Sequence, residues 1–248
     1  MNFFEEDKAY VNKTNYGLYC NTNEHLLRGA PRGIVLEFPG LGGGSCIGGT
    51  AGLGRYGGLF AETLAGDGLL LAYVHTGPWN WMNDGAVRFT DLVTDAIRDR
   101  YGLCGNTPIC AIGGSMGGQG ALRYSAFGKN KVTACAVTCP CVDLKELVFV
   151  KDEFAMTFVS AFAGKNMSLG EALDFYSPRA LVRSMPRIPY LVTADEADGI
   201  VPLSQIEDYV AQMRSLKHDV RYILMKNRTH GEFSEEGLNA LRDFVLSI

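Results

Sequence analysis

A serine lies between glycines near the middle of the chain, in the pentapeptide Gly113-Gly114-Ser115-Met116-Gly117. The apolar residues 109–112 before it predict a strand, and residues 116–126 predict a helix. A serine at the apex of such a turn takes a strained conformation that exposes its hydroxyl, and the glycines two residues before and after it leave room for the crossing. The pattern favours a nucleophilic serine over the alternative, a glycine-rich turn without chemistry.

A serine hydroxyl is a poor nucleophile until a base takes its proton. The base in turn needs an acidic partner that fixes its tautomer and stabilises its charged form. The acidic stretch 195–198 follows a predicted strand at 189–194, and His230 follows a predicted strand at 220–225. His75, at the end of an earlier apolar run, is a second candidate for the base.

Strand and helix patterns alternate from residue 33 to the end of the chain. The strands are expected at residues 34–38, 69–75, 109–112, 132–138, 189–194 and 220–225. Such alternation favours a mostly parallel central sheet with helices on both faces, and it gathers Ser115, the acidic stretch and His230 at the carboxyl edge. One or two short antiparallel strands are expected within residues 8–30, and a last helix is expected with Leu238 facing the core.

The alternation is interrupted between residues 143 and 185. Phe154, Phe158 and Phe162 fall at i, i+4 and i+8, and Ser168 opens a capping-box pattern. We expect a short helical cap over 143–185, with its apolar stripe packed on the core, inserted into a single domain that spans residues 1–248.

Three motifs, in this order and on these elements, resemble the α/β-hydrolase superfamily. They are the pentapeptide around Ser115, the segment Asp198-Gly199-Ile200-Val201-Pro202, which looks like the superfamily's Asp-x-x-Val-Pro, and Thr229-His230-Gly231. The resemblance covers residues 33–248. It implies an α/β-hydrolase fold in which Ser115 is the nucleophile, Asp198 the acid and His230 the base.

The resemblance also bears on the competing residues. Asp195 follows its strand directly and competes for the acid role, but the match to Val-Pro selects Asp198. His75 lies too early for the family order, which favours His230 as the base.

The resemblance further implies an oxyanion hole made by two backbone N–H groups, those of Met116 and Leu41. Many relatives have His-Gly in the loop before the second donor, whereas this chain has Pro39-Gly40. The departure keeps the backbone donor but removes a side chain that often braces the loop.

The walls of the substrate pocket are expected from two loops. One contributes Gly40 and Gly42, and the other contains both tryptophans of the chain, Trp79 and Trp81. For the tryptophans, anchoring of the loop by packed aromatic rings is the alternative to substrate contact.

Other classes of function find little support. A formal charge of −4 and the lack of a basic run exclude an electrostatic site for nucleic acid or an anionic membrane. Residues 52–57 match G-x-G-x-x-G, but no strand precedes them directly and no acidic ribose ligand follows, so no dinucleotide cofactor is expected. The first seven residues lack the features of a signal peptide, which favours a cytoplasmic location.

The seven cysteines are odd in number and imply no disulfide framework. Cys139-Pro140-Cys141 is not a C-x-x-C pair, so no metal and no cofactor are expected.

The sequence thus favours a serine hydrolase that cleaves small or medium carboxylic esters through an acyl-enzyme, with a small-molecule ester as its partner. A prolyl-oligopeptidase-like peptidase is an alternative, although the chain shows no propeller to restrict access. A non-catalytic ligand receptor on the same fold is another. The sequence does not fix the oligomeric state.

Overall fold

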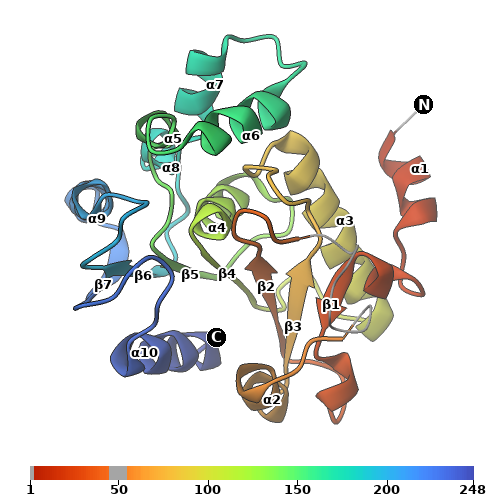
Figure 1. Ribbon diagram of the computed structural model, residues 1–248. Coiled ribbons are helices and arrows are strands. Elements are labelled where there is room, and N and C mark those ends of the chain that lie inside the picture. The colour runs from red at the N-terminus through yellow and green to blue at the C-terminus, as the bar shows by residue number, and fades with distance from the viewer. Residues whose placement is uncertain (1–2, 45–54) are drawn as a thin grey trace.

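The protein, described by a computed structural model over residues 3–44 and 55–248, is built on one twisted sheet (Figure 1). Within those residues the sheet has seven strands in the order β1-β3-β2-β4-β5-β6-β7. The strands are β1 (Cys20–Thr22), β2 (Gly33–Phe38), β3 (Leu69–Val74), β4 (Ile109–Gly114), β5 (Ala134–Thr138), β6 (Pro189–Asp195) and β7 (Asp219–Met225). Only β1 pairs antiparallel, with β3, and the other pairs are parallel.

Helices cover both faces of the sheet, as the sequence predicted. They are α2 (Leu59–Gly66), α3 (Asp84–Tyr101), α4 (Met116–Phe127), α9 (Leu203–Ser215) and α10 (Glu235–Leu246). Apolar residues of α3, α4 and α9 form one core with one side of the strands, and those of α2 and α10 form a second core on the other side. Figure 1 shows α2 and α10 together below the sheet. This is the layering that a buried parallel sheet requires.

The segment before β2 is more helical than predicted. It contains α1 (Phe3–Tyr10), two short 3₁₀ helices (Tyr16–Leu18 and Glu24–Leu26) and the one strand β1. Asn12 and Asn15 explain part of the difference, because their side chains bond nearby backbone groups: Asn15 Oδ1 accepts from the amide of Asn12 at 2.8 Å. Such local bonds favour turns over strands.

Four helices lie between β5 and β6, where the sequence predicted a cap. They are α5 (Leu144–Leu147), α6 (Asp152–Phe162), α7 (Leu169–Tyr176) and α8 (Pro178–Leu181), grouped at the top of Figure 1. The capping box at Ser168 is present, with Glu171 as its acidic partner. Phe154, Phe158 and Phe162 are all buried, so the aromatic stripe packs inward as predicted.

One prediction about α10 is wrong. Leu238 is 48% exposed, whereas Ala240 and Val245 are the apolar residues of this helix that are buried in the core. Leu238 lines a cavity with Leu241, whereas its neighbour Gly237 is the residue of this turn that packs against Met225 of β7.

Two further observations concern membrane-spanning helices and cysteines. Within the described residues, no helix is long and apolar enough to cross a membrane. Six cysteines of the described residues are free; Cys46 and residues 52–54 of the glycine motif lie outside them.

Candidate active site

Ser115 lies at the turn from β4 into α4 with φ 56° and ψ −123°, the strained geometry that the sequence predicted. The flanking glycines make this turn possible. A Cβ on Gly113 would lie 2.4 Å from the carbonyl oxygen of Gly117, and a Cβ on Gly117 would lie 2.1 Å from that of Phe38. Only glycine fits at either position, so the pentapeptide is a steric requirement of the elbow.

Strand β5 and the loop after it hold the elbow in place. The amide of Ser115 donates to the carbonyl of Thr138 at 2.9 Å, and the carbonyl of Ser115 accepts from the amide of Cys141 at 3.2 Å. The Oγ atom of Ser115 lies 3.8 Å from Sγ of Cys141. The serine is thus fixed by its backbone while its hydroxyl makes only a weak contact.

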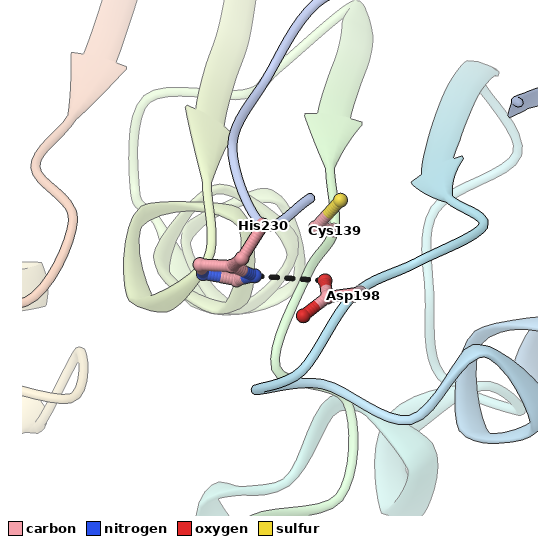
Figure 2. A group of neighbouring side chains, drawn as sticks. All are labelled: Cys139, Asp198 and His230. Carbon is pink, nitrogen blue, oxygen red and sulfur yellow. Dashed lines mark hydrogen bonds and ion pairs between the residues drawn. The ribbon is translucent and has the colours of Figure 1, made fainter. Parts of the chain in front are cut away.

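His230 and Asp198, from the loops after β7 and β6, form a hydrogen-bonded pair (Figure 2). The distance from Nδ1 of His230 to Oδ2 of Asp198 is 2.7 Å. The Asp198 side chain is fully buried, and the His230 side chain is 22% exposed. An imidazole held in this way by Nδ1 leaves Nε2 free toward solvent or substrate.

Asp198 has further donors that hold its charge. Its Oδ1 accepts from the amides of Ile200 at 2.8 Å and Val201 at 2.9 Å, at the start of the turn into α9. Burial acts to raise the pKa of Asp198, but the hydrogen bonds from His230 and the two amides outweigh it, so the pKa lies below its usual value. Asp198 is therefore ionised beside the imidazole at neutral pH.

Asp195, the competing acid, does not contact the His230 ring. Its Oδ2 accepts from the thiol of Cys139 at 2.8 Å and from the amide of Gly231 at 2.9 Å. Burial raises the pKa of this carboxyl above its usual value, against the lowering effect of those two bonds. Asp195 thus holds the backbone of the histidine loop, whereas Asp198 holds the ring.

The alternative histidine lacks an acidic partner. Both ring nitrogens of His75 are buried without a hydrogen-bond partner in the described part of the chain, and burial lowers the pKa of its imidazole. Its ring packs edge-on against Tyr73, with 5.9 Å between centroids. His75 therefore lacks the orienting carboxylate that a general base needs.

Ser115 and His230 reach the same edge of the sheet from different strands. Within residues 3–44 and 55–248, no hydrogen bond joins the serine hydroxyl to His230. Their neighbours Gly114 and Gly231 line one cavity of about 300 Å³, together with Glu37 and Phe233. Catalytic hydrogen bonds are often long or absent without substrate.

Both amides assigned to the oxyanion hole are available. No hydrogen bond within the described residues uses the N–H of Leu41 or of Met116. Neighbouring loop amides are engaged: Gly42 donates to Pro78 at 2.7 Å and Gly43 to Gly40 at 3.0 Å. Gly40 and Gly42 thus brace the loop against itself and against the tryptophan loop, which takes over the bracing that a histidine side chain would give.

The two tryptophans differ in role. Trp81 is 1% exposed, its Nε1 donates to Oγ1 of Thr157 at 2.9 Å, and its ring lies 4.4 Å from that of Phe158. Its burial corrects its assignment to substrate binding: it anchors α6 to the core. Trp79 is 46% exposed and remains accessible.

The sequence analysis did not place two groups, Glu37 and Cys139, beside the site. Glu37, at the end of β2, lines the cavity; its Oε2 is buried without a partner in the described residues, and burial raises its pKa to about 7. Cys139, with φ 44°, directly follows β5. A signal existed for both, because Glu37 is the last residue but one of a predicted strand and Cys139 directly follows another, at the edge that carries the functional loops.

The sheet, its two helical layers and the elbow together define an α/β hydrolase. The family follows from the sequence match: the chain belongs to the prolyl oligopeptidase family, whose model matches residues 79–245. The matched span contains Ser115, Asp198 and His230. No curated protein matches the chain.

Solved structures with the same fold include both esterases and peptidases. Esterase B from Lactobacillus rhamnosis is 16% identical with a TM-score of 0.63, over 89% of this chain and 79% of that one. A truncated carbohydrate esterase from gut microbiota is 14% identical with a TM-score of 0.67, over 89% and 86%. A puromycin-hydrolysing peptidase of Mycobacterium tuberculosis is 16% identical with a TM-score of 0.68, over 88% of this chain but 34% of its own. At these identities the likeness concerns the fold.

Proposed function

We propose that the chain is a serine hydrolase that cleaves small or medium carboxylic esters through an acyl-enzyme. Ser115 is the nucleophile, His230 the base and Asp198 the acid. The observation that carries this proposal is the 2.7 Å bond between Asp198 and His230, on loops that open at the same sheet edge as the strained serine.

The chemistry follows from this arrangement. With Nδ1–H donated to Asp198, Nε2 of His230 accepts the proton of Ser115 as Oγ attacks the ester carbonyl carbon. The tetrahedral intermediate collapses when His230 returns that proton to the departing alkoxide. Water, deprotonated by the same nitrogen, then attacks the acyl-serine, and His230 returns this proton to Oγ of Ser115 as the bond to the acyl carbon breaks and the acid leaves.

Two backbone donors stabilise the negative charge that develops on the carbonyl oxygen. The amide of Met116 is at the N-terminus of α4, where the helix dipole adds to its effect. The amide of Leu41 is the second donor. Both lack partners in the described residues, which leaves them free for this purpose.

We assign a short acyl group to the cavity behind the elbow, which Gly113, Gly114 and Gly231 line. Its volume of about 300 Å³ lies at the lower end of small-molecule sites, and its walls include Phe60, Phe233 and Leu241. Esters are also easier to cleave than amides, because the amine of an amide leaves only after protonation by His230, whereas an alkoxide is a better leaving group. Trp79 is available for contact on the open side.

The proposal is tested with matched substrates. p-Nitrophenyl acetate and butyrate should be hydrolysed with kcat/KM at least ~10-fold above that of the palmitate ester, because a longer chain exceeds the cavity. An active-site serine probe should label the wild type and fail to label Ser115→Ala. If the probe failed to label the wild type, the assignment as an enzyme would be refuted and the non-catalytic receptor would remain.

The family membership makes peptidase activity the specific alternative. Proline-containing peptide anilides should be poor substrates beside the short esters. Efficient cleavage of these amides with negligible ester turnover would move the assignment to a peptidase while keeping the same three catalytic residues.

A further inference from the structure

Three side chains with metal-binding atoms meet at the buried end of the site. Cys139, Asp198 and His230 follow β5, β6 and β7, and one ligand atom from each lies within 4.8 Å of the other two (Figure 2). Thiolate, carboxylate and imidazole are the donors that proteins use for Zn²⁺. The fold brings these three ligand residues together from distant parts of the sequence, so no spacing motif indicates the site.

A second carboxylate lies beside the thiol, outside the group of three. Oδ2 of Asp195 is 2.8 Å from Sγ of Cys139, and Oδ1 of Asp195 is buried without a hydrogen-bond partner in the described residues. The Asp195 side chain is fully buried. The cluster therefore offers three protein ligands from three loops, the number with which zinc keeps a fourth position for water.

From this arrangement we propose that Cys139, Asp198 and His230 form a Zn²⁺ site whose occupation inactivates the hydrolase. The inactivation rests on the proposed function, whereas the metal binding does not. His230 is the partly exposed member of the cluster and gives the ion its path from solvent.

The geometry makes zinc binding and catalysis mutually exclusive. Zinc–ligand distances of about 2.0–2.3 Å place neighbouring ligand atoms of a tetrahedral site roughly 3.3–3.8 Å apart. The 2.7 Å between His230 and Asp198 is shorter than that, so their hydrogen bond must open when the ion enters. When Nδ1 of His230 binds the ion, the neutral imidazole carries its proton on Nε2, so Nε2 can no longer accept the proton of Ser115.

The charges and protons balance. Cys139 binds as the thiolate, and its proton leaves to solvent. The thiolate and the Asp198 carboxylate neutralise the dication, and His230 binds as the neutral imidazole. No electron transfer is involved.

The binding arm of the test needs no enzyme activity. Titration of the metal-free protein with Co²⁺ should produce the absorption of a cobalt–thiolate bond at one equivalent, and Zn²⁺ should displace the cobalt. Titration calorimetry with ZnCl₂ should give one site. Cys139→Ser keeps a hydroxyl donor for Asp195 and should weaken zinc binding by more than the roughly 10- to 100-fold that loss of an outer hydrogen bond costs at zinc sites.

Cys104→Ser is the matched control, because Cys104 is an exposed thiol away from the cluster. It should bind zinc as the wild type does. The absence of the cobalt–thiolate absorption in the wild type, or equal zinc affinity in Cys139→Ser, would overturn the site without recourse to the esterase assay.

The activity arm tests the inhibition. Zn²⁺ should abolish hydrolysis of p-nitrophenyl butyrate by the wild type and by Cys104→Ser, and EDTA should restore it. Cys139→Ser should keep its own metal-free rate of ester hydrolysis at zinc concentrations that inhibit the wild type. Stoichiometric zinc binding with undiminished turnover would refute the inactivation. A protein that binds zinc but hydrolyses no ester would refute the proposed function and leave the metal site standing.

Discussion

Replacement of Asp198 by Asn should reduce kcat/KM on the order of 10³- to 10⁴-fold, because the structure dictates how the amide must sit. The two amides of Ile200 and Val201 both point at Oδ1, so the Asn oxygen is held there and its NH₂ faces Nδ1 of His230. The imidazole must then carry its proton on Nε2, which removes the base for Ser115. A wrong tautomer of this kind costs about 10⁴-fold in a serine protease triad, or about 5 kcal/mol of transition-state stabilisation.

The opposite orientation of the Asn amide would only partly avoid this loss of activity. It would restore an acceptor for His230, but the amides of Ile200 and Val201 would then face an NH₂ group. Each buried N–H left without an acceptor costs about 1–3 kcal/mol of stability. Asp195→Asn is the matched control. Its oxygen can occupy the place of Oδ2 and accept from Gly231 and Cys139, while its NH₂ takes the place of the unpartnered Oδ1. That variant should lose no more than about 10-fold, or about 1.4 kcal/mol.

The assay is steady-state hydrolysis of p-nitrophenyl acetate by both variants, with circular dichroism and thermal melting to show that each is folded. If the folded Asp195→Asn enzyme lost as much activity as Asp198→Asn, or more, the assignment of the acid would be reversed.

Three further predictions follow from the same geometry. Ser115→Ala should lower kcat by about 10³-fold or more with an unchanged melting temperature, because it deletes the nucleophile and only a weak contact; near-normal turnover would end the assignment. Gly117→Ala should destabilise the fold by about 1–3 kcal/mol or more in chemical denaturation, since its Cβ would lie 2.1 Å from a backbone oxygen of β2, whereas Gly114→Ala, 3.6 Å from its nearest neighbour, should cost less. The lowered pKa of Asp198 keeps this acid ionised below its usual range, so the carboxyl carbon of Asp198 should show no titration above about pH 4 when the pH is varied in an NMR experiment; a midpoint above that value would contradict the environment of Asp198.

Much of the framework could be predicted from sequence because the signals are local. The run of apolar residues 109–112, the glycines around Ser115 and the helical spacing after it act within one strand, turn and helix. The capping box at Ser168 is also a local device. Alternation of such elements leaves few arrangements other than a parallel sheet, and its carboxyl edge then gathers the loops.

The parts that sequence did not predict depend on packing between distant segments. Trp81 and Trp79 have the same chemistry and lie two residues apart, yet Thr157 and Phe158 bury only Trp81. The role of Asp195 depends likewise on Cys139, which a different loop supplies. No local pattern encodes which of two neighbouring residues meets such a partner.

The two carboxylates beside His230 show how environment can divide roles between identical side chains. Three donors, including two backbone amides, hold Asp198 and keep its pKa below the usual value, whereas Asp195 receives a thiol and one amide and its pKa is raised. By linkage, the lowered pKa of Asp198 contributes stability that is present above its unfolded pKa and is lost as the pH falls through the folded value. The raised pKa of Asp195 has the opposite sign: its contribution is complete below the unfolded pKa and is lost as the pH rises through the folded value. Near neutral pH the fold therefore favours the charge on Asp198 and disfavours the charge on Asp195, and of these two carboxylates it is Asp198 that is hydrogen-bonded to the imidazole.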